Sequence, residues 1–162
     1  METIPRRAAI KKILAPTDLS HNSLDGVIQA AELARRVGAD LVLMMAIPEE
    51  RAADEVVHGR YADRLLETCR MQLVSWFTQH VPPVLRHSVA AKFLVVIGPP
   101  AEAILEVAEA EKIDLIVMAT HGRSGFRRFL RGSVAEGVIR AATSPVLTVR
   151  AGGPPAFPVS AA

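Results

Sequence analysis

Short apolar runs alternate along the chain with longer segments in which apolar and polar residues mix. The apolar runs cover residues 10–15, 41–47, 93–97, 115–118 and 146–149, and turn or polar residues bound each of them. Continuous runs of this length are typical of strands covered on both faces, because a half-exposed strand would alternate apolar and polar residues. Five buried strands are therefore predicted.

The segments between these runs repeat their apolar residues with a period near 3.6, which predicts four helices. They cover approximately residues 24–34, 61–77, 100–108 and 133–139. Gly38 is expected to end the first helix, and Pro100 suits the first position of the third. Val81, Pro82 and Pro83 follow the end of the second helix.

Strict alternation of strands and helices predicts the α/β class. Such chains form a parallel sheet with helices on both faces, joined by right-handed crossovers. For five strands of this kind we expect a three-layer α/β/α fold with strand order 3-2-1-4-5. The last strand then lies at an edge of the sheet, where a second copy of the chain could pair with it.

One domain over residues 10–150 accounts for all of these elements. Residues 1–9 are expected to form a flexible N-terminal arm. Residues 151–162 are rich in Gly, Pro and Ala and predict a disordered C-terminal tail. Residues 48–57 are acidic and show no clear period, so we expect them to be loosely held.

Composition narrows the class of protein further. The chain has 162 residues, of which 50% are hydrophobic and only 4% aromatic, so an aliphatic core can form without a disulfide or a structural metal. A net charge of +2 argues little for a nucleic-acid partner. Cys69, the single cysteine, excludes the common zinc and CxxC patterns and favours a packed thiol in a reducing compartment.

The sequence also bears on location. The basic N-terminus lacks the apolar core of a signal peptide, and no run approaches the ~20 apolar residues of a membrane span. We therefore expect a soluble, cytoplasmic protein.

The residues that could bind a ligand lie directly after the first and fourth strands. In an open parallel sheet, ligands bind beyond the carboxyl ends of the strands where the strand order reverses, here between strands 1 and 4. Residues 16–20, PTDLS, follow strand 1, and a long loop over residues 119–133 follows strand 4. Gly122 and Gly132 would let main-chain amides approach a ligand, and Gly132 directly precedes a helix, where an anion is favoured. With four arginines in the loop, at positions 123, 127, 128 and 131, this pattern predicts a phosphate site.

Structural alternatives exist for several of these residues. Ser133 and Glu136 have the spacing of a capping box, so Ser133 can simply cap its helix. Asp18 can bind a ribose hydroxyl or hold Mg²⁺ through water, but it can equally cap the first helix, as can Ser20. His121 has no evident nucleophile partner, so a role in organising the loop or contacting phosphate is favoured over catalysis.

Several motifs of nucleotide-using enzymes are missing from the sequence. The chain has no G-x-x-x-x-G-K-[ST] loop and no G-x-G-x-x-G after strand 1. The H-x-G-H and S-G-G-x-D-S motifs are also missing. The remaining histidines do not have the spacing of metal ligands.

Four segments together resemble the universal stress protein family. They are Ile-Leu-Ala-Pro-Thr-Asp at 13–18, Gly-x-Pro-Ala at 98–101, Ala-x-x-Gly-x₉-Gly-Ser at 119–133 and Ser-Pro-Val-Leu-Thr-Val at 144–149. The resemblance runs from about residue 11 to 150. It implies an adenine nucleotide alpha-hydrolase-like, Rossmann-like fold and a homodimer formed through the last strand, residues 146–149.

One branch of the family binds ATP through G-x-x-G-x₉-G-[ST]. Here Ala119 replaces the first glycine, whereas Gly122, Gly132 and Ser133 are intact, so the resemblance implies membership of the ATP-binding branch. Carried over by position, the nucleotide-binding residues are Pro16, Thr17, Asp18, Ala46, Met118, Ala119, His121, Gly122, Arg123, Gly132, Ser133 and Val134. Ala46 stands where the family usually has a larger Val.

The resemblance also assigns roles to these positions. Pro16, Thr17 and Ala46 would line the adenine, and Met118 would pack near the base or sugar. Asp18 would meet the ribose or, through water, a metal ion. Gly122, Gly132, Ser133 and Val134 would bind the phosphates.

The function so implied is that of an ATP-binding stress or regulatory protein. ATP, or AMP, is the expected cofactor, with Mg²⁺ accompanying ATP, and hydrolysis is expected to be slow or absent. The alternative is an interaction or chaperone-like module that binds no nucleotide. RNA binding through Gly122-Arg-Ser-Gly125 is the least favoured, because a GXXG loop in KH domains joins two helices and no aromatic platform accompanies it here.

Overall fold

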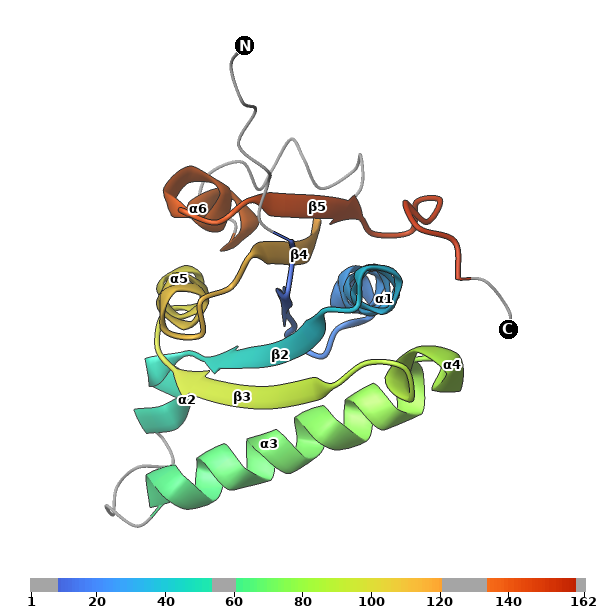
Figure 1. Ribbon diagram of the computed structural model, residues 1–162. Helices are drawn as coiled ribbons and strands as arrows, with labels where there is room; N and C mark the ends of the chain where they lie inside the picture. Colours follow the sequence, from blue (N-terminus) through green and yellow to red (C-terminus); the bar gives the residue numbers. More distant parts are fainter. Residues whose placement is uncertain (1–8, 54–60, 121–133, 160–162) are drawn as a thin grey trace.

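Five parallel strands form one sheet in the order β3-β2-β1-β4-β5 in the computed structural model, which describes residues 9–53, 61–120 and 134–159 (Figure 1). The strands are β1 (Lys12–Pro16), β2 (Asp40–Ile47), β3 (Ala91–Ile97), β4 (Leu115–Thr120) and β5 (Val146–Arg150). This confirms the predicted class, the strand order 3-2-1-4-5 and the edge position of the last strand.

Helices cover both faces of the sheet. Those described are α1 (His21–Val37), α2 (Glu49–Ala53), α3 (Tyr61–His80), α4 (Pro83–Arg86), α5 (Pro100–Ala110) and α6 (Val134–Ala141). Side chains of α1 and α3 share one apolar core with the sheet, and side chains of α5 and α6 share the other. Figure 1 shows α5 and α6 on one side of the strands and α1 on the other, with α3 running alongside β3. All four predicted helices are therefore present.

The ends of α1 explain why the helix occupies these residues. Ser20 is its N-cap, and the Ser20 hydroxyl accepts a hydrogen bond from the amide of Ser23 at 3.2 Å. Gly38 is its C-cap and has a φ of 69°, a left-handed conformation that glycine adopts without steric cost. The predicted end at Gly38 is confirmed.

Two short helices, α2 and α4, were not predicted. Residues 49–53 of the segment expected to be loosely held form α2, where Ala52 is buried. Pro83 begins α4, and the fully buried Leu85 anchors it. Helices of one turn are too short to show a period in the sequence, so burial of one side chain positions each of them.

Successive side chains along a strand point alternately into the two cores. Ile13 and Leu43 face the core shared with α1 and α3, whereas Leu14 and Met44 face the core shared with α5 and α6. Cys69 is buried in the first core, as expected for a packed thiol. Both cores are mainly aliphatic.

Helix α1 lies unusually close to β4. A Cβ atom on Gly26 would lie 2.7 Å from the main-chain nitrogen of Ala119 and 3.1 Å from the carbonyl carbon of Met118. Real Cβ atoms essentially never approach so closely, so only glycine lets the helix contact the main chain of the strand. Gly26 therefore sets the distance between α1 and the carboxyl end of β4.

The C-terminal segment packs along α1 instead of extending into solvent. The amide of Gly152 donates to Asp25 Oδ2 at 2.7 Å, and the amide of Phe157 donates to Gln29 Oε1 at 2.6 Å. Figure 1 shows the chain passing beside α1 after β5. Residues 152 and 157, in the segment for which the composition predicts a disordered tail, thus bond side chains of α1 through their main-chain groups. Residues 1–8 and 160–162 lie outside the described residues.

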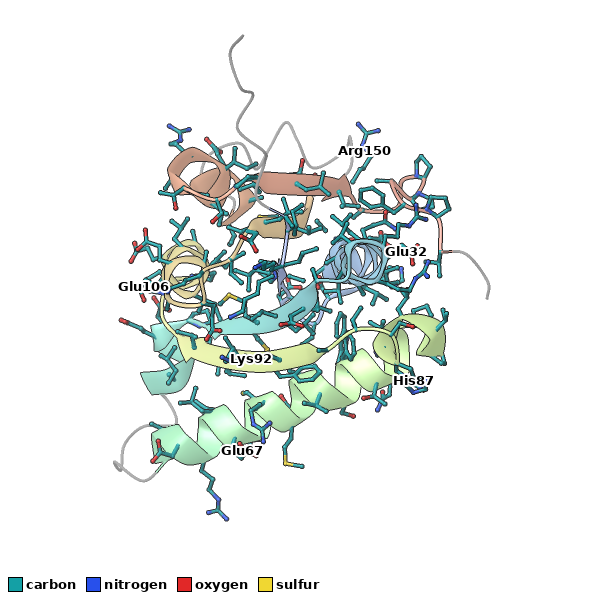
Figure 2. All side chains as sticks on the ribbon, viewed as in Figure 1. Glu32, Glu67, His87, Lys92, Glu106 and Arg150 are labelled. Atoms are coloured by element: carbon teal, nitrogen blue, oxygen red, sulfur yellow. The ribbon has the colours of Figure 1, made fainter. Side chains whose placement is uncertain are left out.

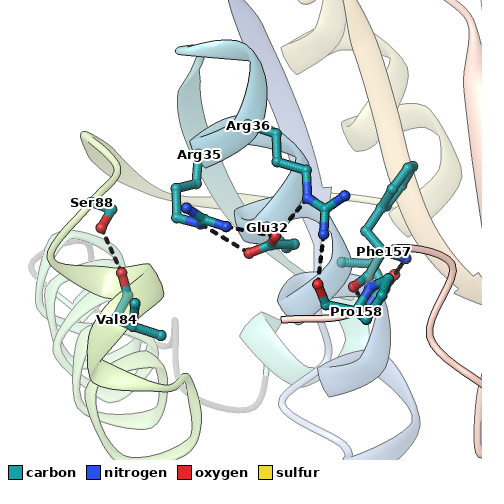
Figure 3. A network of polar contacts seen from close by, with 8 residues as sticks. Glu32, Arg35, Arg36, Val84, Ser88, Phe157 and Pro158 are labelled. Atoms are coloured by element: carbon teal, nitrogen blue, oxygen red, sulfur yellow. Dashed lines mark hydrogen bonds and ion pairs between the residues drawn. The ribbon is translucent and has the colours of Figure 1, made fainter. Parts of the chain in front are cut away.

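A fully buried carboxylate stands on the same helix. Glu32 has no exposed surface and accepts hydrogen bonds from Arg35 Nη2 at 2.8 Å and from Arg36 Nε at 2.6 Å (Figure 3). The hydrogen bonds from Arg35 contribute most to holding the pKa of Glu32 below its ordinary value of 4.5. Desolvation opposes that shift, and Arg36 adds to it.

We predict that Gly26→Ala destabilises the protein by about 1–3 kcal/mol, because the methyl group must push α1 away from β4. The sign is informative, since the same change elsewhere in a helix usually stabilises by roughly 0.5–1 kcal/mol. Urea denaturation measures the effect. Gly137→Ala in α6 is the matched control and should cost less, because its methyl meets only the Ala101 methyl, at 3.0 Å. Equal stability of Gly26→Ala and the native protein would contradict this account of the contact.

We predict that Glu32→Gln lowers the free energy of unfolding at neutral pH by about 1–3 kcal/mol, since charge-assisted hydrogen bonds are lost. A folded-state pKa below 4.5 means that the contribution of Glu32 is present above that pH and is lost as the pH falls through the folded-state pKa. The stability curves of the variant and the native protein should therefore converge in acid. The measurement is thermal unfolding between pH 7 and pH 3.

Glu67→Gln is the matched control. Glu67 also pairs with an arginine three residues on, Arg70, but its side chain is 56% exposed. Figure 2 shows the two carboxylates on different helices, Glu32 on α1 and Glu67 on α3. An exposed pair contributes about 0–1 kcal/mol, so this control should change stability little. If the stabilities of Glu32→Gln and the native protein kept the same difference from pH 7 to pH 3, the role of the buried carboxylate would be contradicted.

Candidate functional site

The carboxyl ends of β1 and β4 lie side by side at the centre of the sheet. The two strands pair through Ile13 with Leu115 and Leu14 with Ile116. From β1 the sheet continues to β2 and β3, whereas from β4 it continues to β5 on the other side. The strand order therefore reverses here, which is where open parallel sheets bind ligands.

Thr17 opens the loop after β1, and its polar groups are used within the protein. Its side chain is buried, and its amide donates to the carbonyl of Met44 at 2.9 Å. Its hydroxyl oxygen accepts from the amide of Leu19 at 3.0 Å and shares a hydrogen bond of 2.8 Å with the hydroxyl of Ser23. Thr17 thus ties the loop to β2 and α1.

Asp18 stands next to it and is exposed. Its Oδ1 accepts from the amide of Ser20 at 3.0 Å, whereas Ser20, as described above, caps α1. The structure therefore resolves the capping alternative in favour of Ser20. Asp18 closes the turn that leads into the helix, and Leu19 within that turn has a left-handed φ of 63°.

Electrostatics keep Asp18 ionised. Desolvation at the strand end raises the pKa of its carboxyl group, but hydrogen bonds from the side chain and amide of Ser20 and from Ser23 together outweigh it, and the pKa lies below its ordinary value. An exposed, ionised carboxylate at the end of a central strand can accept hydrogen bonds from a hydroxyl ligand or hold a cation through water.

Ala119 occupies the position of the missing motif glycine, near the end of β4. It pairs with Val149 in the sheet, and its methyl lies 3.3 Å from where a Cβ of Gly26 would stand. The methyl therefore faces α1. Among the residues that the structure describes, the non-glycine residues with positive φ are Leu19 and Lys112, so Ala119 has a conformation that suits alanine.

Two further predicted residues take different places. Met118 is buried in the core shared with α5 and α6, among Leu14 and Ile104, and so lies beneath the sheet edge instead of at its surface. Ala46 is half-buried on β2, two residues beyond Met44, the register partner of Pro16. Ala46 and the turn after Pro16 thus share the carboxyl edge of the sheet.

The structure describes the positions of only some of the predicted site residues. It brings Pro16, Asp18, Ala46 and Ala119 to one edge of the sheet. Val134 begins α6 and is partly exposed. His121, Gly122, Arg123, Gly132 and Ser133 lie outside the described residues.

Sequence reasoning missed a groove between α5 and α6. It encloses about 400 Å³ and is lined by Pro99, Pro100, Ala101, Glu102, Val134, Glu136, Gly137 and Arg140. Gly137 approaches Ala101 closely within this lining: a Cβ atom on Gly137 would lie 3.0 Å from the Ala101 methyl. Gly137 inside an amphipathic segment was the available signal, since a helical glycine often marks a close contact.

Within residues 9–53, 61–120 and 134–159, no three side chains of His, Cys, Asp or Glu gather as a metal site would require. Over the same ranges no helix combines the length and apolar character needed to cross a bilayer.

Comparison with known proteins identifies relatives of this chain. The sequence pattern of the universal stress protein family matches residues 9–150. The universal stress protein MJ0531 of Methanocaldococcus jannaschii is 32% identical over 150 residues, which cover 86% of this chain and 82% of that protein. The universal stress protein MJ0577 of the same organism is 26% identical over 154 residues, covering 86% and 94%.

Solved structures agree with the sequence comparison. The structure of MJ0577 superposes with a TM-score of 0.67 at 26% identity and covers 91% of this chain and all of that one. A universal stress protein in complex with cAMP superposes with a TM-score of 0.63 at 21% identity, covering 89% of this chain and 99% of that one. This chain belongs to the universal stress protein family.

Proposed function

We propose that this protein binds an adenine nucleotide, ATP above all, at the carboxyl edge of β1 and β4. The observation that carries the proposal is the placement of Asp18 beside the end of β4. Asp18 is an exposed carboxylate at the end of β1, and the residues directly after β4 carry the glycines of the motif. A carboxylate for the sugar and a glycine-containing loop for the phosphates would then face the same ligand.

The described residues suggest how the parts of the nucleotide would be held. Asp18 would accept a hydrogen bond from a ribose hydroxyl or hold Mg²⁺ through water. Pro16 and Ala46 would offer an apolar surface to the adenine. The start of α6 at Val134, with Gly132 and Ser133 before it, would present amides to the phosphates, as helix N-termini do. Thr17 would act indirectly, by holding the loop in place.

Relatives with this fold support an adenine nucleotide as the ligand class. One was solved in complex with cAMP. Another, from Archaeoglobus fulgidus, was solved in complex with dAMP; it is 19% identical to this chain with a TM-score of 0.51, covering 86% of this chain and 96% of that one.

The proposed role is to hold the nucleotide as a signal in a cytoplasmic stress response. Hydrolysis would be slow or absent, because the sequence lacks the motifs that position a general base or an arginine finger in phosphoryl-transfer enzymes. Among the described strands β5 pairs only with β4, so its other edge could pair with β5 of a second copy and form a homodimer.

We predict that ATP with Mg²⁺ stabilises the protein against heat. Millimolar ATP bound with micromolar affinity adds ~4 kcal/mol, which raises Tm by about 10 °C for a chain of this size. Gly132→Val combined with Ser133→Val should abolish the shift, since the side chains block the amides. Ser75→Val, at an exposed serine of α3, is the control and should keep it.

Mass spectrometry of nucleotide released on denaturation gives an independent measurement. The native protein should release adenine nucleotide and the double variant should not. If the native protein shows neither a thermal shift nor released nucleotide, the interaction or chaperone-like alternative replaces this proposal.

We predict that Ala119→Gly changes ATP affinity by less than about threefold, because the Ala119 methyl faces Gly26 of α1. In contrast, Ala46→Val should raise affinity several-fold, since each added methyl that contacts adenine contributes up to ~0.8 kcal/mol. Isothermal titration calorimetry compares the two variants with the native protein. A gain of about tenfold or more on Ala119→Gly would mean that the methyl does obstruct the ligand.

A further inference from the structure

Four polar side chains form a stripe along α1. Asp25, Gln29, Glu32 and Arg36 follow one another at intervals of four, three and four residues, so they share one face of the helix. Gln29 is only 3% exposed and Glu32 is not exposed at all. Buried polar side chains require partners. Glu32 pairs with arginines of the helix itself, whereas the other three side chains of the stripe contact residues 152, 157 and 158.

Both polar atoms of the Gln29 carboxamide form hydrogen bonds with the main chain of Phe157. Its Oε1 accepts from the Phe157 amide at 2.6 Å, and its Nε2 donates to the Phe157 carbonyl at 3.1 Å. The carboxamide thus pairs with one residue as a neighbouring strand would. The same pair of bonds is available to any extended segment that reaches this position.

Arg36 recognises the next residue and the aromatic ring. Its Nη2 donates to the carbonyl of Pro158 at 2.6 Å, and its guanidinium lies 5.9 Å from the centre of the Phe157 ring (Figure 3). Glu32, buried beside it, accepts from Arg36 Nε and so fixes the orientation of the guanidinium. Glu32 therefore acts as a positioning residue.

The docked segment buries little of its own surface. Phe157 and Val159 are half-buried, and Val159 packs against the core, whereas residues 154–156 are exposed. Ordering a segment costs conformational entropy for every residue, and few apolar side chains offset that cost here. Gly152, with a φ of 68°, turns the chain after β5 and can serve as a hinge. Such a segment can leave its surface and return.

We propose that the stripe of α1 is a docking surface for an extended Phe-Pro-Val segment, filled by residues 157–159 of the same chain and exchangeable for those of a second copy. A second copy is the occupant that the structure favours, because it presents the same segment on the same glycine hinge. Exchange of identical elements between copies adds no new kind of contact and therefore costs little.

A complementation experiment on the full chain tests this inference. Gln29→Met removes both hydrogen bonds to Phe157 while nearly keeping the side-chain volume, so it impairs the surface and leaves the segment intact. Phe157→Pro removes the amide and the ring, so it impairs the segment and leaves the surface intact. Hydrogen exchange at the Phe157 amide, followed by NMR in a ¹⁵N-labelled chain, reports docking.

The expected results are specific. In the native protein the Phe157 amide should exchange slowly, and Gln29→Met should speed its exchange by about tenfold or more. Adding an excess of unlabelled Phe157→Pro chain to labelled Gln29→Met chain should restore most of the protection, because the labelled segment docks on the intact surface of the other copy. Unlabelled Gln29→Met chain should restore none.

Controls separate docking from general effects. Gln72→Met, at an exposed glutamine of α3, should leave the Phe157 amide protected, as should Ala156→Pro, one residue before the contacts. Should Gln29→Met fail to fold, Arg36→Met removes the donor to Pro158 from an exposed position and replaces it in the mixture. Fast exchange in the native protein, or no recovery of protection in the mixture, would overturn the proposal.

Discussion

Direct contact between α1 and the main chain of β4 is the constraint on which the other parts of the molecule depend. Because Gly26 has no side chain, the helix rests on the peptide groups of Met118 and Ala119. The interior of a protein is packed densely, so a small shift at this contact would be transmitted along the helix. The contact lies at the strand end that leads into the candidate loop.

Helix α1 consequently serves three regions at once. Its first turn holds the loop after β1 through Ser20 and Ser23, its middle sets the distance to β4, and its polar stripe holds the C-terminal segment. The proposed ligand would therefore lie at the N-terminal end of α1, and the docked segment lies along the same helix from Asp25 to Arg36. The three regions are thus held by different residues of the same helix.

Much of the fold could be predicted from the sequence because its signals are local and repeated. Apolar runs indicated the strands, a period of 3.6 indicated the long helices, and Gly38 indicated the end of α1. Helices of one turn carry no period, so α2 and α4 were not predicted. At the candidate site, residue types indicated Asp18. Only the folded structure shows that the Thr17 hydroxyl makes its hydrogen bonds within the protein and that the Ala119 methyl faces a helix.

Main-chain recognition of the C-terminal segment has a consequence for evolution. The amides and carbonyls that Asp25, Gln29 and Arg36 contact are present whatever side chains the segment carries. Most of its residues can therefore drift without loss of docking, and related chains can retain the arrangement with little trace in an alignment. The family pattern ends at residue 150, immediately before this segment begins. The polar stripe buried on α1 is the clearer sequence mark of such docking, because the segment contributes mainly main-chain groups.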